Sequence, residues 1–357
     1  MLIRSLGRDP ASVRRPRRQV RNVLREPRRH RGFTPPTPPP TPDTAVEYRG
    51  WAQLGLVDEI REHGAVVVRR FGHDVVAWVD ENDRVQARRV AEPVNPIDPT
   101  GPTGPTASFD EGGDADEAVP VVDLHGVALM YHWAPGDDRS SPPPPIPDTT
   151  DLLASLRDEG VHWTSYCVTF PTTVVGMAEN SADRAHFATL HRTTVGHASP
   201  VGVEVRADGS MVVDTLMRVW TLPGVLSDSK VVMSYAGPFT CRTRFHNLGR
   251  RTDLLAFSGP TGDHTVEMLF VSISTANLGV VGRLFHQATA RRGRLLLYED
   301  RRVLSTRTLP EHPNLSDYDG PLLAVRRWMD GHRAPLEHRA GTRARVGATP
   351  IRTPALP

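Results

Sequence analysis

Residues 179–191 read Glu-Asn-Ser-Ala-Asp-Arg-Ala-His-Phe-Ala-Thr-Leu-His, a segment that carries two imidazoles, two carboxylates and an amide. On a single helix, Glu179, Asp183 and His186 would share a face, because they are separated by four and three residues. His191 would lie about 140° from His186, since five residues advance an α-helix by roughly 500°. Both histidines can therefore bind one metal ion only if the helix ends or distorts between them.

The spacing of Asp183, His186 and His191 resembles the mononuclear iron segment of the Rieske non-heme iron oxygenases. In that family two histidines and one carboxylate form a facial triad that leaves positions open for dioxygen. The resemblance implies that His186 and His191 are ligands of a mononuclear Fe2+, and that Asp183 and Asn180 are catalytic residues. The alternative interpretation is that these are ordinary surface or core histidines on an amphipathic helix.

The third metal ligand should be a carboxylate far along the chain, and Asp300 is the best candidate. Residues 293–307 have a helical pattern with apolar residues on both sides of Asp300. These apolar residues are Leu296, Leu297, Val303 and Leu304. Glu299, Arg301 and Arg302 fall outside the stripe. A charged carboxylate on an apolar face is costly unless it is paired, protonated or bound to a cation. The pattern predicts either a metal ligand, as the family's late carboxylate implies, or a buried Asp paired with an Arg.

The two cysteines, Cys167 and Cys241, bear on both the cofactor and the compartment. Their number fits a reducing cytoplasm, so a cytoplasmic protein is expected. A Rieske [2Fe-2S] centre needs two Cys and two His, and neither cysteine has a His in a Cys-x-His or Cys-x-x-His arrangement. The sequence therefore predicts that this chain holds no [2Fe-2S] cluster.

The N-terminal segment is rich in arginine. Residues 1–31 contain eleven Arg and two acidic residues, and residues 32–42 are a proline-rich spacer. A targeting peptide, a nucleic-acid arm and a disordered extension all fit this composition. Because no aromatic residues or periodic apolar face accompany the charge, we expect residues 1–43 to be disordered and predict no nucleic-acid partner. No apolar run approaches the length of a membrane span, and residues 1–31 lack the long apolar region of a secretory signal, so export is not expected.

The chain from residue 44 to 148 is expected to form a small β domain. Strand-like stretches, broken by turn residues, occupy much of residues 48–89 and 119–136. They resemble the start and the closing strands of a Rieske domain from the steroid-oxidising branch of the family. Where that family has its first cluster-binding hairpin, residues 90–118 contain no Cys or His and are expected to be disordered. The predicted unit is a degenerate Rieske-like domain without cluster ligands.

Residues 149–336 are expected to form an α+β catalytic domain, and residues 337–357 a disordered tail. Six strand-like stretches follow the histidine segment and should form one curved antiparallel sheet. They occupy residues 201–206, 211–220, 229–237, 239–247, 254–259 and 264–274. A long helix over 276–307 and a shorter one near 321–333 should pack against the sheet. This arrangement resembles the helix-grip catalytic domain of the Rieske oxygenases.

The resemblance is closest to 3-ketosteroid 9α-hydroxylases and cholesterol 7-desaturases, which implies a steroid-like or other bulky apolar substrate and O2. Without its own cluster, such an oxygenase would take electrons from a separate Rieske or ferredoxin-type protein. Family members are commonly trimers, so a homotrimer is one expected assembly. Two alternatives stay open: a non-catalytic helix-grip protein that binds a ligand, and a zinc hydrolase on the same three ligands.

Overall fold

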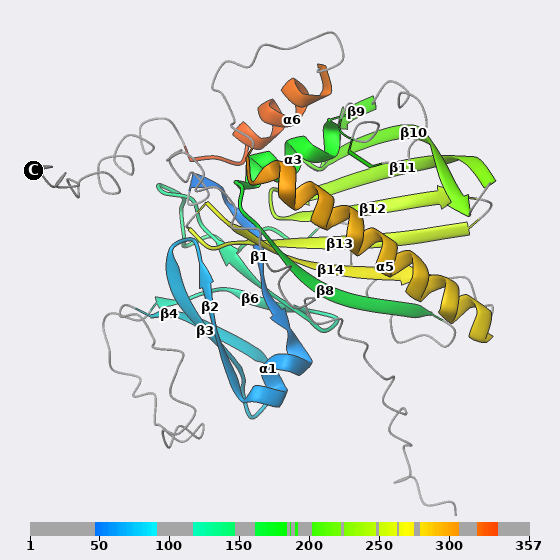
Figure 1. Cartoon of the computed structure of the whole chain (residues 1–357). Helices are drawn as coiled ribbons and strands as arrows, with labels where there is room; N and C mark the ends of the chain where they lie inside the picture. The colour runs from blue at the N-terminus through cyan, green and yellow to red at the C-terminus, as the bar shows by residue number, and fades with distance from the viewer. Residues whose placement is uncertain are drawn as a thin grey trace, which may run out of the picture.

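The computed structural model describes residues 47–90, 117–146, 161–183, 186, 190–191, 202–222, 225–247, 250–262, 264–274, 279–306 and 320–334. The α+β class is confirmed, since three antiparallel sheets and several helices make up this part of the chain (Figure 1). The predicted boundaries at 43/44, 148/149 and 336/337, and the segments expected to be disordered at both termini, lie outside the described residues. Among the described helices, none combines the length and apolar character needed to cross a bilayer.

The large sheet has seven strands in the order β8-β14-β13-β12-β11-β10-β9. The strands are β8 (His162–Phe170), β9 (Gly202–Val205), β10 (Met211–Leu222), β11 (Val225–Gly237), β12 (Thr240–Asn247), β13 (Arg250–Pro260) and β14 (Val266–Ser274). From β9 to β14 each strand pairs with the next one along the chain, which confirms the predicted meander. β8 pairs antiparallel with β14 and is an edge strand of the sheet. The histidine segment follows β8 in the chain, after α3 (Val174–Ala182).

Three helices gather on one side of this sheet: α3 (Val174–Ala182), α5 (Gly279–Leu304) and α6 (Gly320–Asp330). Figure 1 shows α5 lying across the strands, with its C-terminal end beside α3 and α6. The inward side of α5 carries His286, Ala290, Arg294, Asp300 and Leu304, all buried and spaced by about one or two helical turns. The predicted long helix and shorter helix are thus confirmed within a few residues at each end.

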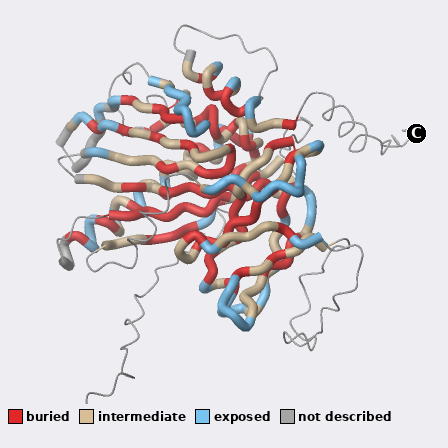
Figure 2. The backbone as a smooth tube through the Cα atoms, turned by 180° about the vertical axis from the view of Figure 1, so that it is seen from behind, coloured by how far each residue is buried: buried red, intermediate tan, exposed pale blue. Residues whose placement is uncertain are grey.

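Alternation along the strands gives the large sheet two apolar faces. The face toward the helices contributes buried Val213, Val231, Met233 and Phe270 to the same core as α3 and the end of α5. The opposite face contributes a second cluster that packs against the small sheets; its sheet residues are Leu255, Phe257, Leu269, Val271 and Ile273. Seen from behind, the middle of these strands is almost continuously buried (Figure 2).

The N-terminal part forms two small sheets, β1-β7-β6 and β2-β3-β4-β5. The elements are β1 (Gly50–Leu56), α1 (Val57–His63), β2 (Ala65–Arg70), β3 (His73–Val79), β4 (Val85–Val90), β5 (Glu117–Ala118), β6 (Val121–Leu124) and β7 (Val127–His132). The predicted loop over 90–118 is contradicted at its ends, because Val90 closes β4 and Glu117–Ala118 form β5. Residues 91–116 lie outside the described part of the chain.

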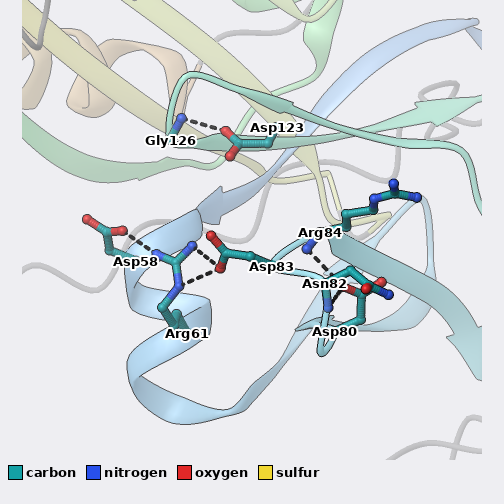
Figure 3. Close-up of polar contacts among 8 residues, drawn as sticks. All are labelled: Asp58, Arg61, Asp80, Asn82, Asp83, Arg84, Asp123 and Gly126. Atoms are coloured by element: carbon teal, nitrogen blue, oxygen red, sulfur yellow. Dashed lines mark hydrogen bonds and ion pairs between the residues drawn. The ribbon is translucent and has the colours of Figure 1, made fainter. Parts of the chain in front are cut away.

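The sequence pattern predicted strands alone in this region, and the helix α1 corrects that prediction. Its burial follows the helical period, with Val57 and Ile60 inside and charged residues outside. Arg61 bonds to Asp58 in the same helix and to Asp83 in the turn between β3 and β4 (Figure 3). In that turn Asp80 accepts hydrogen bonds from the backbone N–H groups of Asn82 and Arg84, which holds its shape.

The β2–β3 turn attaches the small sheets to the large sheet, at the end of β13. The backbone N–H of Phe71 donates to Pro260 O at 2.8 Å, and that of Gly72 donates to Thr261 O at 3.0 Å. Gly262 has φ of +95°, and a Cβ atom there would lie 2.3 Å from the backbone nitrogen of Gly72. Only glycine satisfies both conditions, so this close approach of two turns depends on it.

A buried carboxylate on the sheet gives the fold a predicted acid sensitivity. Asp253 is 1% exposed and bonds to Arg242 Nε at 2.9 Å and Arg251 Nε at 2.7 Å. Burial alone would raise the pKa of Asp253, but the hydrogen bonds from Arg251 and Arg242 outweigh it and hold the pKa below its usual value. The unfolded chain then binds more protons, so this contribution to stability is complete above about pH 4 and declines as the pH falls below that.

The unfolding free energy of the wild type should fall between about pH 5 and about pH 3, a range centred on the usual Asp pKa of about 4. We expect this fall to be smaller in Asp253→Asn. Urea denaturation at several pH values measures this slope. Asp228→Asn is the matched control, because Asp228 bonds to Arg218 on the exposed surface of the same sheet. An unchanged slope in Asp253→Asn would show that another group causes the acid sensitivity.

Candidate metal centre

Helix α3 packs on the face of the large sheet that lies toward the helices, and the histidine segment follows it in the chain. Thr173 caps its N-terminus by accepting a hydrogen bond from Gly176 N at 3.2 Å, and Val174 and Ala178 pack into the core. The helix ends at Ala182, and Asp183 has extended backbone angles, with φ −76° and ψ 102°. The predicted common helix face of Glu179, Asp183 and His186 is therefore wrong, because the helix stops before His186.

Glu179 consequently has a different environment from the two histidines. It is fully buried in α3, and its carboxylate accepts a hydrogen bond from Arg326 Nε of α6. The pair joins the two helices just before the chain turns into the histidine segment. Glu179 thus acts in packing α3 against α6, and Asn180, the next residue, is also buried in α3.

A backbone hydrogen bond with helical spacing joins His186 and Leu190, just before His191. Leu190 N donates to His186 O at 2.7 Å, and His191 follows as a non-helical residue. Helix α3 thus ends at Ala182, before His186, and His191 lies outside a helix, so the two histidines are not held on one continuous helix. The His186 and His191 rings come to 5.1 Å between centroids, at 77° to each other.

Asp300 on the inward side of α5 completes a buried cluster with them. Its Oδ1 lies 3.1 Å from His191 Nε2 and 3.7 Å from His186 Nε2. The three potential ligand atoms all lie within 4.8 Å of one another. The side chains are 8%, 5% and 6% exposed for His186, His191 and Asp300, so the cluster is closed to bulk water. All three metal ligands predicted from sequence are thus brought together.

Both histidines present Nε2 to Asp300 because their other nitrogen is occupied. His186 Nδ1 lies 2.6 Å from the backbone carbonyl oxygen of Asp183, and His191 Nδ1 lies 3.1 Å from Glu299 Oε2. A carbonyl and a carboxylate can only accept, so each Nδ1 carries a hydrogen, and in the neutral ring Nε2 is the nitrogen whose lone pair can bind a metal ion. Such outer partners usually set the tautomer and orientation of metal-binding histidines.

The electrostatics of the cluster are unequal for the two imidazoles. Burial lowers the pKa of His186, although the Asp300 charge opposes this. Burial also acts to lower the pKa of His191, but the neighbouring carboxylates of Asp300 and Glu299 outweigh it and raise that pKa above its usual value. The neighbouring carboxylates therefore favour the protonated form of His191 more than that of His186.

The donor set fits a divalent cation. Despite the short distance to His191, Asp300 Oδ1 makes no hydrogen bond of acceptable geometry and is a buried oxygen without a hydrogen-bond partner. Such an oxygen is costly unless a cation binds it. Two neutral imidazole nitrogens and a carboxylate form the facial triad of non-heme Fe2+ sites, and the same set also accepts Zn2+. The alternative of an Arg partner for Asp300 has no support among the described residues, whose ion pairs to Asp300 come from the two histidines.

Sequence reasoning missed Glu299. The helical wheel placed this residue outside the apolar stripe, and the structure agrees that its side chain is partly exposed, yet the carboxylate turns back to His191. The stripe itself was only partly correct, because Val303 is exposed while Leu304 is buried. The one sequence signal available was a second acidic residue next to the predicted ligand.

Glu299→Leu is expected to lower the affinity for Fe(II) by about 10–100-fold, as loss of an outer-shell histidine partner typically does. The metal-free protein should keep its fold, since the side chain lies at the surface. Anaerobic titration with Fe(II) measures the change. Glu299→Gln retains an oxygen that can accept from Nδ1 and should lose much less affinity than Glu299→Leu. Equal losses in both variants would mean that charge, and not orientation, is the contribution of Glu299.

Both cysteines lie on the large sheet, Cys167 on β8 and Cys241 on β12, and not in the small sheets. Burial raises the pKa of Cys241 to about 12, and the hydrogen bond with Thr243 offsets this only in part. Cys167 is exposed on β8. Neither position is in the strands that resemble a Rieske domain.

Known proteins share this architecture. A 3-ketosteroid-9-alpha-monooxygenase oxygenase component from Rhodococcus rhodochrous is 21% identical over 330 aligned residues, which cover 81% of each chain. The NdmA QL mutant of Pseudomonas putida CBB5 with caffeine has a TM-score of 0.55 at 14% identity, covering 80% of this chain and 90% of that one. Apo dicamba monooxygenase has a TM-score of 0.56 at 14% identity, covering 84% and 99%. No protein-family model matches the sequence. These likenesses confirm the fold and the resemblance to Rieske oxygenases.

Proposed function

We propose that this chain, which has the fold of the Rieske oxygenases, is a non-heme Fe(II) monooxygenase or desaturase. Its substrate would be a steroid-like or other bulky apolar molecule, and its electrons would come from a separate protein. The observation that carries the proposal is the buried cluster of His186, His191 and Asp300, in which two oriented Nε2 atoms face an unsatisfied carboxylate oxygen. A surface histidine pair would need neither this burial nor this orientation.

The proposed substrate class rests on the apolar lining and on the relatives. The sheet face toward the helices contains Val213, Val231, Met233 and Phe270, and such apolar side chains favour an apolar molecule. One relative is named for a 3-ketosteroid, whereas the structural neighbours were solved with caffeine or are named for dicamba. The molecules in these names differ, and the steroid-like substrate is inferred from the sequence relative and the apolar face together.

The proposed mechanism assigns separate tasks to the residues around the site. His186, His191 and Asp300 would hold Fe2+, which supplies activation of O2 when bound. Asp183 holds the His186 ring through its backbone carbonyl, and its Oδ1 lies 3.2 Å from the backbone nitrogen of His186. Burial of the three ligands keeps bulk water away from the reacting atoms. Asp183 and Asn180 are proposed as the catalytic residues next to the ligands.

The proposed separate electron donor follows from the cysteine positions. Both cysteines belong to the large sheet, and the chain offers no Cys-x-His or Cys-x-x-His pair. A cluster in a partner protein would then take the place of one in the same polypeptide. A homotrimer is the assembly that the family resemblance favours.

Metal content and the visible spectrum, measured on protein purified anaerobically with Fe(II), test the proposal. We expect one iron per chain, held with 2-His-1-carboxylate ligation and without [2Fe-2S] absorption. Added Zn(II) should compete for the same site. Folded protein that binds no iron would overturn the oxygenase and favour a helix-grip protein that captures an apolar ligand. Iron together with [2Fe-2S] absorption would overturn the separate donor.

A further inference from the structure

The outward side of α5 is unusual among the described surfaces. It exposes large apolar side chains, with Leu284 60%, Leu295 49% and Val303 41% exposed. Arg291, Arg292 and Arg302 alternate with them and are also exposed. On a helical wheel these six residues fall within one outward sector, opposite Asp300 and its buried neighbours. We call this sector the outer face of α5, and Figure 1 views the molecule from the side on which it lies.

The outer face is cationic as well as apolar. Its three arginines are accompanied by one acidic residue of the same sector, Glu299, so it carries a net positive charge. Apolar side chains mixed with arginine are typical of surfaces that bind another protein. Because the arginines alternate with the apolar residues and do not border an apolar strip, the pattern differs from that of a helix lying in a membrane surface. A protein with an acidic surface is the partner that complements it.

Glu299 links the outer face to the metal centre. Its side chain is 38% exposed, yet its Oε2 lies 3.1 Å from His191 Nδ1. His191 Nε2 in turn faces Asp300 across the cluster. A partner resting on the C-terminal half of α5 would thus be separated from the metal ligands by one helix, about 10–12 Å across, and by one hydrogen-bonded carboxylate.

We propose that the outer face of α5, from Arg291 to Val303, is the docking surface of the electron donor, an acidic ferredoxin-type [2Fe-2S] protein. The inference rests on the proposed function and adds where the partner binds. In each transfer the reduced [2Fe-2S] cluster would lose one electron and be oxidised, and a ferric ion held by His186, His191 and Asp300 would gain that electron and become ferrous. Glu299 provides the hydrogen-bonded link between the docked donor and His191.

Arg291→Glu/Arg302→Glu in the full chain tests the docking surface, with an acidic plant-type [2Fe-2S] ferredoxin as the probe. Binding to the metal-free protein at low ionic strength should weaken by at least about tenfold in the double variant, and should weaken in the wild type as salt is added. Arg283→Glu is the matched control. It makes the same kind of substitution once on the same helix, half of the charge change of the double variant, about 24 Å from Glu299 along the axis, and should alter the affinity less than about twofold.

Electron transfer is the second measurement, made on the iron-loaded protein. The double variant should be reduced by the ferredoxin at least about tenfold more slowly, whereas its iron content and its reduction by dithionite stay unchanged. Wild-type protein that binds the ferredoxin no more tightly than the double variant would overturn the proposal. An equal loss in Arg283→Glu would also overturn it, because the attraction would then be unspecific. A change of oligomeric state in the double variant would overturn it in favour of a second copy of this chain on the outer face.

These outcomes separate the docking surface from the proposed function. Ferredoxin binding is measured without iron, so its loss at the outer face can be observed even if the chain never binds a metal. Conversely, iron that binds and is reduced by dithionite, with no binding of ferredoxin, would leave the metal centre standing and remove only the docking surface.

Discussion

His186→Ala and His191→Ala are each expected to lower the affinity for Fe(II) by more than about 100-fold, since loss of an outer-shell partner alone costs 10–100-fold. Each variant removes one of two Nε2 atoms that face Asp300 Oδ1 at 3.7 and 3.1 Å. One histidine and one carboxylate leave an incomplete facial triad. The metal-free fold should survive, because both imidazoles contact polar groups of Asp183, Glu299 and Asp300.

Anaerobic titration with Fe(II), followed by metal analysis after desalting, measures the loss. His286→Ala is the matched control, because His286 is similarly buried and belongs to the same domain but bonds to Thr164 on β8. This variant should lose some stability and keep its iron. Full iron occupancy in His186→Ala or His191→Ala would contradict the ligand assignment, and unfolding of both variants without metal would mean that their main role is structural.

The fold could be predicted where one periodic pattern decided the element. The strands from Gly202 to Ser274 are separated by turn residues such as Gly209, which has φ of +80°. Their meander follows because short turns join neighbouring antiparallel strands. Helix α1 escaped prediction because seven residues hold too few turns for a clear period, and its attachment depends on Arg61 reaching Asp83 in a distant turn.

The residues of the metal centre also fall into two groups, those that a local sequence pattern identifies and those that only the tertiary structure identifies. His186 and His191 are close in sequence, and Asp300 stood out as a charge on an apolar stripe, so all three could be proposed before the structure. The helical wheel failed between Glu179 and His186, because it assumed one continuous helix where Asp183 breaks it. Glu299 could not be found from sequence, since its role depends on how α5 lies against His191. Local patterns identify ligands, whereas the partners that orient them are set by tertiary packing.

Arg326→Leu is expected to cost about 3–5 kcal/mol of the unfolding free energy, because it leaves the buried carboxylate of Glu179 without its arginine. Glu179 is fully buried in α3, and Arg326 reaches it from α6. Chemical denaturation of the metal-free protein measures the loss without a contribution from metal binding. Because α3 ends three residues after Glu179, a weaker contact with α6 should also reduce Fe(II) affinity by freeing the turn at Asp183.

Two further variants separate the ion pair from a general effect of altering α6. Arg327→Leu removes the same charge from the neighbouring exposed position and should stay within about 0.5 kcal/mol of the wild type. Glu179→Leu/Arg326→Leu removes both charges and should recover much of the stability, since apolar pairs often replace buried ion pairs at little cost. If the double variant were as unstable as Arg326→Leu, the lost stability would come from packing of the arginine side chain. Recovery of stability with weak Fe(II) binding would instead assign the pair to orientation of the histidine segment.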